Sequence, residues 1–409
     1  MHMGRKLKIL IYYTHKESLG HTSRITTLAN AFARAAGRRF QVYLLQAGIP
    51  QPHIAYDREI EKIDVPYPFY SKAQFKNLPV DIRNMDIRAE FIFEKTKAIM
   101  PDILMTEYFP FGRSECFLEL SRALLMLKNL KKKIFATIGY PYITLDVIKN
   151  TSRFFQYTRF YDKIFIHTPE DFEYPFFINL VPDEERRKLY ESIFTTLREK
   201  IIHTGYIFPG YEEGLTHART ENLTASWKRS GRTRLLVSRG GGTTCPKIIA
   251  SSILAQKYLN RECAMLLSCG PATGKKEMEF FRELIRKHRI KNTTVVPYLP
   301  HFGKCLQASD ISISMAGYNT SVQLLRLGKK CIVIPHTILA KSGWINDQTP
   351  RSRLLGKYLD ARLFDYDELK SEPLACAIRQ LAQARAPKPL PLDSFQGAAN
   401  TVKTVLKLL

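Results

Sequence analysis

The chain has 409 residues, of which 45% are hydrophobic and 24% are charged, and its formal net charge is +24. This length favours at least two domains, and the composition is typical of a soluble globular protein. Because no run of about 18 apolar residues occurs, we expect no transmembrane helix. The chain also begins without a signal-peptide pattern. The basic residues are scattered and accompany no nucleic-acid-binding motif, so no nucleic-acid partner is expected.

The cysteines indicate the compartment. Seven cysteines, an odd number without a Cys-x-x-Cys pair, favour free thiols in a reducing cytoplasm. No group of His, Cys and Asp has the spacing of metal ligands, so we expect neither a structural zinc nor a cofactor. The positive charge suits peripheral contact with an anionic membrane, and equally suits solvated helix faces. The sequence therefore predicts a cytoplasmic protein and leaves membrane contact open.

Apolar strands alternate with helical segments along the whole chain. The strands predicted in the first half are 8–13, 41–45, 102–106, 133–137, 163–167 and 200–203. Those predicted in the second half are 234–237, 264–268, 294–297, 311–314 and 331–334. Helices are predicted between them, for example over 23–36, 85–100 and 115–128. This rhythm predicts an α/β fold whose parallel sheets are covered by helices on both faces.

Two Gly/Pro-rich segments divide the chain. The first lies at 205–214 and the second at 386–391. Such segments are typical of linkers between domains. We therefore predict an N-terminal Rossmann-like domain over 5–205, a C-terminal Rossmann-like domain over 206–388, and a C-terminal helix within 389–409.

Two small-residue turns between a strand and a helix are candidate phosphate sites. One is Ser314-Met315-Ala316-Gly317-Tyr318-Asn319-Thr320-Ser321, and the other is Arg239-Gly240-Gly241-Gly242-Thr243. Glycine allows a ligand to approach the backbone, and the N–H groups at a helix start favour an anion. Arg239 adds a fork of donors suited to phosphate oxygens. Each turn alone is also compatible with an ordinary strand–helix connection, and neither is a P-loop or a Gly-x-Gly-x-x-Gly fingerprint.

A third motif, Gly20-His21, lies between the first strand and its helix. Histidine is the side chain best suited to take a proton near neutral pH, although a capping or surface role is the alternative. With the two turns above and the segment from Glu107 to Arg113, this motif resembles the GT-B glycosyltransferases. More narrowly, it resembles the branch containing the lipid-linked N-acetylglucosaminyltransferase of peptidoglycan synthesis and its uncharacterised relatives.

The resemblance implies two Rossmann-like domains facing across a cleft. It also implies inverting, metal-independent sugar transfer from a nucleotide-diphosphate sugar, with a UDP-sugar favoured. In this family the histidine of the first turn is the candidate general base, so the resemblance assigns this role to His21. Glu107 then orients His21 or contacts the acceptor, with a surface carboxylate as the alternative.

The resemblance also implies a donor site. Val296 and Tyr298 belong to the loop that reads the base, and Asp347 and Gln348 belong to the element that holds the donor sugar. Gln323 stands where the family commonly has a ribose-binding Glu, which leaves the donor identity open. The full set of implied donor residues is Arg239, Gly240, Gly241, Gly242, Thr243, Val296, Tyr298, Met315, Ala316, Gly317, Asn319, Thr320, Gln323, Asp347 and Gln348.

Two other functions remain open from the sequence. One is a nucleotide-sugar 2-epimerase or hydrolase of the same fold, and the other is a non-catalytic nucleotide-sugar binder. Such epimerases use several carboxylates, and Glu107 and Asp347 are the obvious ones here. The acceptor is either lipid-linked or a small molecule. The aromatic residues that would offer it a surface, unless they are core residues, are Phe69, Tyr70, Phe154, Phe155 and Tyr157.

Overall fold

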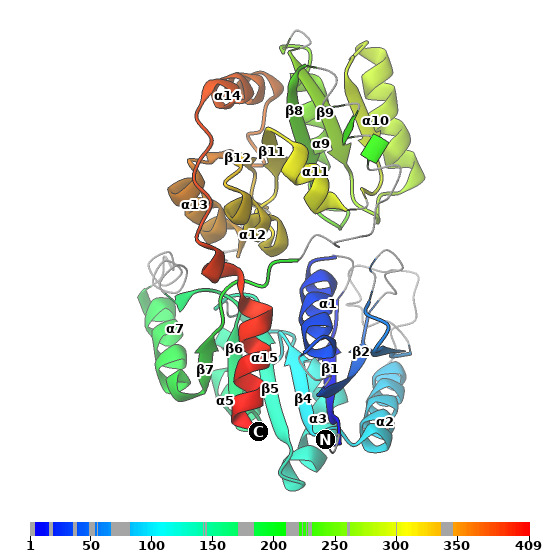
Figure 1. Ribbon diagram of the computed structural model, residues 1–409, viewed down its shortest axis with the longest axis vertical. Helices are drawn as coiled ribbons and strands as arrows, with labels where there is room; N and C mark the ends of the chain where they lie inside the picture. Colours follow the sequence, from blue (N-terminus) through cyan, green and yellow to red (C-terminus); the bar gives the residue numbers. More distant parts are fainter. Residues whose placement is uncertain are drawn as a thin grey trace. The chain divides into compact units, whose positions relative to one another are not determined.

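The computed structural model describes residues 5–15, 19–35, 39–48, 54, 56–66, 82–141, 143, 145–170, 184–209, 221–222, 224–225, 227, 231–259, 262–299, 301–336 and 347–409. Contacts divide the chain into two compact units (Figure 1). The first unit comprises residues 1–16, 21–208 and 393–409, and the second comprises residues 17–20 and 209–392.

The first unit contains a seven-stranded sheet of order β3-β2-β1-β4-β5-β6-β7, in which neighbouring strands are parallel. Its strands are β1 Leu7–Tyr13, β2 Phe40–Gln46, β3 Ile60–Asp64, β4 Ile103–Glu107, β5 Lys133–Ile138, β6 Lys163–Ile166 and β7 Ile201–His203. Its helices are α1 Leu19–Ala33, α2 Ile82–Ile99, α3 Cys116–Asn129, α4 Leu145–Lys149, α5 Thr151–Thr158, α7 Glu184–Thr196 and α15 Gly397–Leu408, with short 3₁₀ turns at Arg198–Lys200 and Leu392–Phe395.

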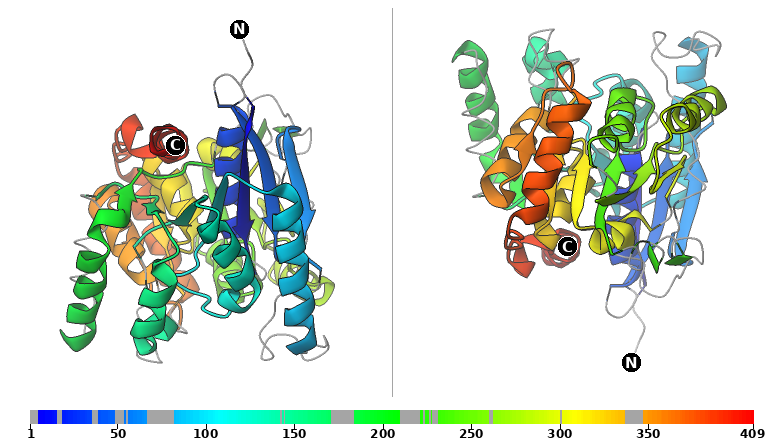
Figure 2. Two further views of the ribbon diagram at one scale, coloured as in Figure 1. Left: turned by 90° about the horizontal axis from the view of Figure 1, so that it is seen from below. Right: turned by 90° about the horizontal axis from the view of Figure 1, so that it is seen from above.

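Successive side chains along β1 point to opposite faces of the first sheet, and each face carries an apolar layer. Ile9 and Ile11 belong to the layer that includes α1 and Val405 of α15. Leu10 and Tyr12 belong to the layer that includes α2, α3 and α7. The views agree, since α15 lies on one side of this sheet and α2 and α7 lie on the other (Figures 1 and 2). The C-terminal helix therefore completes the core of the first unit.

The second unit contains a six-stranded parallel sheet of order β10-β9-β8-β11-β12-β13. Its strands are β8 Thr233–Ser238, β9 Cys263–Ser268, β10 Thr293–Val296, β11 Ile311–Ser314, β12 Lys330–Val333 and β13 Arg362–Leu363. Its helices are α9 Pro246–Ala255, α10 Lys275–Lys287, α11 Phe302–Ala308, α12 Tyr318–Leu327, α13 Gln348–Leu359 and α14 Ser371–Gln383. The helices α9, α10 and α14 share one apolar layer with Leu235 and Val237.

Both sheets have a point at which the strand order reverses, between β1 and β4 in the first and between β8 and β11 in the second. In open α/β sheets, ligands bind outside the carboxyl ends of the strands at this point. The predicted fold class, two parallel-sheet α/β units, is confirmed. The prediction omitted β3 and β13: β3 has three charged residues among its five and only Ile60 is buried, and β13 has two residues.

None of the helices that the structure describes is long and apolar enough to cross a membrane. The seven cysteines are free, and all except Cys376 are buried.

Candidate active site

In the first unit, His21 and Glu107 meet at the reversal point of the sheet. His21 lies in the first turn of α1, which follows β1, and Glu107 is the last residue of β4, which pairs with β1. His21 Nδ1 lies 2.7 Å from Glu107 Oε1. The Glu107 side chain is fully buried, whereas the imidazole is 23% exposed. In the neutral ring Nδ1–H donates to the carboxylate, so the lone pair is on Nε2.

A buried arginine supports this pair. Arg24, one turn further along α1, also donates to Glu107 Oε1, and its side chain is 5% exposed. An Arg24 nitrogen lies 3.4 Å from His21 Nδ1. Because Nδ1–H already donates to Glu107, this approach places positive charge beside the ring and is not a hydrogen bond. The carboxylate is thus held between two basic groups.

The surroundings set the charge of both groups. Burial lowers the pKa of His21, and the nearby Arg113 and Arg24 lower it further, against the opposing effect of Glu107. Burial alone would raise the pKa of Glu107, but the charges of His21 and Arg24 outweigh it, and that pKa falls below its usual range. Near neutral pH the pair is therefore a neutral imidazole beside an ionised carboxylate.

In the second unit, the two glycine-bearing turns leave neighbouring strands at the same edge. Ser238 ends β8 and Ser314 ends β11, and these two residues are partners in the parallel register. The turn 239–245 leads to α9, and the turn 315–317 leads to α12. The sheet therefore brings together, within one unit, the two segments that the sequence singled out.

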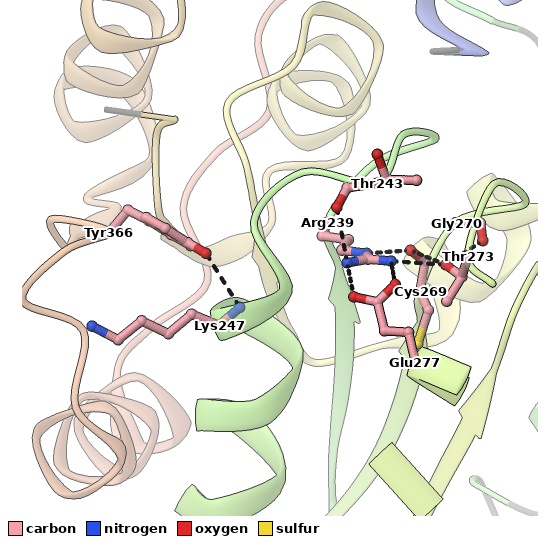
Figure 3. Close-up of polar contacts among 8 residues, drawn as sticks. All are labelled: Arg239, Thr243, Lys247, Cys269, Gly270, Thr273, Glu277 and Tyr366. Carbon is pink, nitrogen blue, oxygen red and sulfur yellow. Dashed lines mark hydrogen bonds and ion pairs between the residues drawn. The ribbon is translucent and has the colours of Figure 1, made fainter. Parts of the chain in front are cut away.

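The two helix starts differ in what their N–H groups already bind. In α12 the first recorded backbone bond is Ser321 N–H to the Gly317 carbonyl, so the N–H groups of Asn319 and Thr320 lack an intrahelical partner. In α9 the first residue is Pro246, and the Lys247 N–H lies 3.4 Å from the Tyr366 hydroxyl (Figure 3). The α12 start is therefore the better anion site of the two.

Packing does not explain two of the glycines in these turns. A Cβ built on Gly242 or Gly317 meets no described atom within 4 Å, and neither residue has a positive φ. Gly240 differs, because its φ of +84° favours glycine on conformational grounds. Gly317 is the N-cap of α12 and has φ −64° and ψ 149°, which any residue adopts. Open space beside Gly242 and Gly317 permits the close approach of a ligand.

Arg239, which the sequence predicts to contact phosphate, has partners within the protein in this structure. Its buried guanidinium already donates to the Cys269 and Thr243 carbonyls, to Thr273 Oγ1 and, through two 2.7 Å bonds, to both oxygens of Glu277 (Figure 3). All five N–H groups thus have acceptors within the protein. The sequence offered no local signal for this, because Glu277 lies 38 residues further along the chain.

A second buried arginine, which sequence reasoning missed, holds the turn before α12. Arg351 of α13 donates to the Ala316 carbonyl, and lies 3.0 Å from Asp347 Oδ2. Asp347 remains 32% exposed in this pair. Gln348 accepts a hydrogen bond from the His336 N–H at 3.1 Å. The predicted sugar-binding element is therefore tied to the same turn that carries Gly317.

The remaining predicted donor residues have the following positions. Val296 is buried at the end of β10, with its carbonyl bonded to the Cys269 N–H, and Tyr298 is half-buried in the following loop. Gln323 of α12 is 8% exposed. Gly241, Met315, Asn319 and Thr320 are half-buried, Ala316 is buried and Thr243 is exposed. The predictions at Phe69 and Tyr70 lie outside the described residues.

Two of the aromatic residues predicted to face an acceptor are core residues. Phe154 and Tyr157 are 2% and 7% exposed and belong to the apolar layer between α3 and α5, with Phe155 packed against it. Across the described ranges, no group of three or more His, Cys, Asp or Glu residues is arranged to hold a metal ion.

Comparison with known proteins gives one family match. Residues 240–405 match the glycosyltransferase family 28 C-terminal domain, which covers the glycine turns, α12 and α13. The chain is also 27% identical over 224 residues to the UDP-N-acetylglucosamine--N-acetylmuramyl-(pentapeptide) pyrophosphoryl-undecaprenol N-acetylglucosamine transferase of Desulforamulus reducens. That alignment covers 52% of this chain and 58% of the relative. The chain spans about half the length of the curated relatives it matches.

Solved structures share the fold over the whole chain. The crystal structure of Acinetobacter baumannii MurG matches with a TM-score of 0.56 and 13% identity, covering 98% of this chain and 99% of that one. The UDP-GlcNAc 2-epimerase of Neisseria meningitidis, bound to UDP-GlcNAc, matches with a TM-score of 0.61 and 12% identity, covering 98% and 100%. The chain therefore resembles the GT-B glycosyltransferases in fold, and its second unit resembles the C-terminal domain of glycosyltransferase family 28.

Proposed function

We propose that this protein transfers a sugar from a nucleotide-diphosphate sugar, a UDP-sugar in preference, to an acceptor hydroxyl. The reaction inverts the anomeric carbon, uses no metal ion, and takes His21 as its general base. The first unit supplies the base, and the second unit binds the donor.

The order of the loops in the second unit supports this proposal most strongly. The expected base loop follows β10, the glycine turns follow β8 and β11, and the sugar-binding element Asp347-Gln348 follows β12. Across the sheet, which runs β10-β9-β8-β11-β12, this is the order of base, diphosphate and sugar in the donor. The three strand spacings from β10 to β11 span roughly 14 Å, enough for a nucleoside and its phosphates.

The start of α12 is the proposed site of the diphosphate. The N–H groups of Asn319 and Thr320 point out of the first turn, and the helix dipole favours negative charge there. As the bond between the anomeric carbon and the diphosphate breaks, the leaving group takes the electron pair and gains charge. Donors aimed at that charge lower the barrier without a metal ion.

The base step uses the first unit. Nε2 of His21 removes the proton from the acceptor hydroxyl while its oxygen attacks the anomeric carbon. The imidazolium that forms keeps its Nδ1–H bond to Glu107, whose negative charge stabilises it. Glu107 therefore acts through His21, and fixes the tautomer that leaves Nε2 as the acceptor of the proton.

Nucleotide binding and transfer together test this function. UDP should raise the melting temperature more than dTDP, GDP or ADP do, since a ligand at 100 times its Kd adds about 2.7 kcal/mol to the free energy of unfolding. Transfer from a UDP-sugar to a hydroxyl acceptor should persist in EDTA. Loss on chelation that Mn²⁺ or Mg²⁺ reverses would contradict the metal-independent mechanism. Release of free sugar or of an epimer without transfer would instead favour a hydrolase or an epimerase, and binding without any turnover would favour a non-catalytic binder.

A lipid-linked acceptor is the finer part of the proposal, and a surface of the first unit supports it. Leu118 and Leu125 lie seven residues apart on α3 and are 65% and 51% exposed. Leu118 lines a pocket of about 650 Å³ between α3 and α5. The pocket is lined by Phe117, Leu118, Lys128, Arg153, Gln156, Tyr157, Arg159 and Phe160. Exposed apolar side chains near the cationic groups of Lys128, Arg153 and Arg159 suit an anionic lipid surface.

Sedimentation with anionic vesicles measures this contact. Wild-type protein should co-sediment at low salt and dissociate as salt rises, because screening weakens surface charges. Replacing both Leu118 and Leu125 with Ser should reduce binding, whereas Leu363→Ser, at a residue that is 45% exposed in the second unit, should not. Absence of vesicle binding at every salt concentration would favour a soluble acceptor.

A further inference from the structure

The Arg239 side chain joins two loops that leave neighbouring strands. Ser238 of β8 pairs with Ser268 of β9, so the glycine turn 239–245 and the turn 269–274 start side by side. Arg239 donates to the Thr243 carbonyl within its own turn. It also donates to the Cys269 carbonyl and to Thr273 Oγ1 in the neighbouring turn. The carboxylate of Glu277, in the first turn of α10, receives two of its N–H groups. Figure 3 shows the guanidinium between these partners.

The two turns also touch through their backbones. A Cβ built on Gly270 would lie 2.6 Å from the Gly240 carbonyl oxygen and 3.1 Å from that of Gly242, and Gly270 has φ +100°. A side chain at 270 would therefore push the glycine turn away from its neighbour. The position of the glycine turn therefore depends on Gly270 in the neighbouring turn.

We propose that Arg239 and Glu277 are a positioning pair that holds the Gly240–Gly242 turn in the conformation that receives the donor's phosphates. The inference rests on the proposed function. A run of three glycines has more backbone conformations to lose than any other tripeptide, so a ligand that must order it binds weakly. Holding the turn before the donor arrives removes that cost from binding.

This role differs from general stabilisation. A buried ion pair is a weak source of folding stability, because the loss of hydration offsets much of the attraction between the charges. The same strand offers a comparison. Arg234, at the opposite end of β8, donates to Asp310 through its backbone N–H, Nε and one terminal nitrogen, at 2.7, 2.9 and 2.6 Å. That pair holds no glycine turn.

The experiment compares Arg239→Lys and Glu277→Gln with Arg234→Lys. For each, one measures the Kd of UDP, the melting temperature, and amide hydrogen exchange of residues 240–244 without nucleotide. Lys offers one ammonium in place of a fork with five donors, so it cannot reach the four partners of Arg239. We expect both pair variants to exchange faster at 240–244 and to raise the Kd at least about tenfold, which corresponds to re-ordering roughly one residue. Arg234→Lys should lower the melting temperature without either change.

The outcomes separate the two proposals. If wild-type protein binds UDP and the pair variants bind it as well as Arg234→Lys does, the positioning role is wrong and the proposed function stands. If wild-type protein binds no nucleotide, the proposed function fails and the inference fails with it. If Arg239→Lys does not fold, Glu277→Gln alone tests the positioning role. The Gln side chain has nearly the same shape as Glu, and its amide oxygen can still accept a hydrogen bond from Arg239, so this variant should fold.

Discussion

His21→Ala should lower the rate of sugar transfer by about 10² to 10⁴ while leaving the Kd of UDP almost unchanged. The base removes the acceptor's proton and makes no contact with the diphosphate, so the loss falls on turnover. A neutral His21→Gln side chain should be equally poor, because an amide does not accept a proton near neutral pH. Steady-state kinetics with saturating donor, together with calorimetry of UDP binding, measure the two effects.

A matched control comes from the same sheet. His203 ends β7, four strands from β1 in the sheet order, so His203→Ala should retain full transfer activity. Normal turnover in His21→Ala would show that the base is elsewhere, with Glu107 as the next candidate. Loss of UDP binding in His21→Ala would instead place His21 in the donor site.

The pH profile of transfer gives a second measure of the same group. The base works only when neutral, so the rate rises with pH as His21 loses its proton. Because burial and two arginines lower the pKa of His21 below its ordinary 6.5, the acid limb should fall below pH 6.5. Glu107→Gln removes the charge that opposes this lowering, so the limb should move to still lower pH while the plateau falls.

The sequence predicted what depends on local pattern. The strands β8 and β11 appear as apolar runs, and Gly317 and the Gly240–Gly242 turn follow them at the distances that strand–helix turns require. The resemblance implied that Glu107 orients His21 or contacts the acceptor, and the pairing of β1 with β4 brings these two side chains to one sheet edge. Local pattern thus located the glycine turns, whereas the roles of the other candidate residues came from the resemblance.

Partner choice is not local, and there the sequence reasoning fell short. Arg239 next to three glycines looked like a phosphate ligand, because nothing nearby in sequence competes for its donors. Its partner Glu277 is one of several charged residues in α10, and nothing in the sequence distinguishes it from the others. Arg351 is likewise one of 62 Lys and Arg residues, and no motif marks it as buried. The same limit applies to α15: the sequence predicted a C-terminal helix but not the sheet that this helix covers.

Gly317→Val should abolish most nucleotide binding while leaving the fold intact. The backbone at 317 suits any residue, and a Cβ there meets open space, so the protein itself accommodates the change. The cost to folding is about 1 kcal/mol, that of a poor N-cap. A diphosphate displaced from the N–H groups of Asn319 and Thr320 loses two charge-assisted hydrogen bonds, about 3–6 kcal/mol together, which weakens binding by about 10² to 10⁴.

The chain provides a matched glycine for this test. Gly274 is the N-cap of α10 with φ −71° and ψ 159°, close to the values at Gly317, and a Cβ there also meets no described atom within 4 Å. Gly274→Val therefore imposes the same change in N-cap residue on a helix that the proposal does not assign to the diphosphate. Calorimetry should give a wild-type Kd for UDP in Gly274→Val and a much larger one in Gly317→Val. Equal affinities in the two variants would mean that the phosphates lie away from α12. The donor would then have to be held by some other part of the second unit.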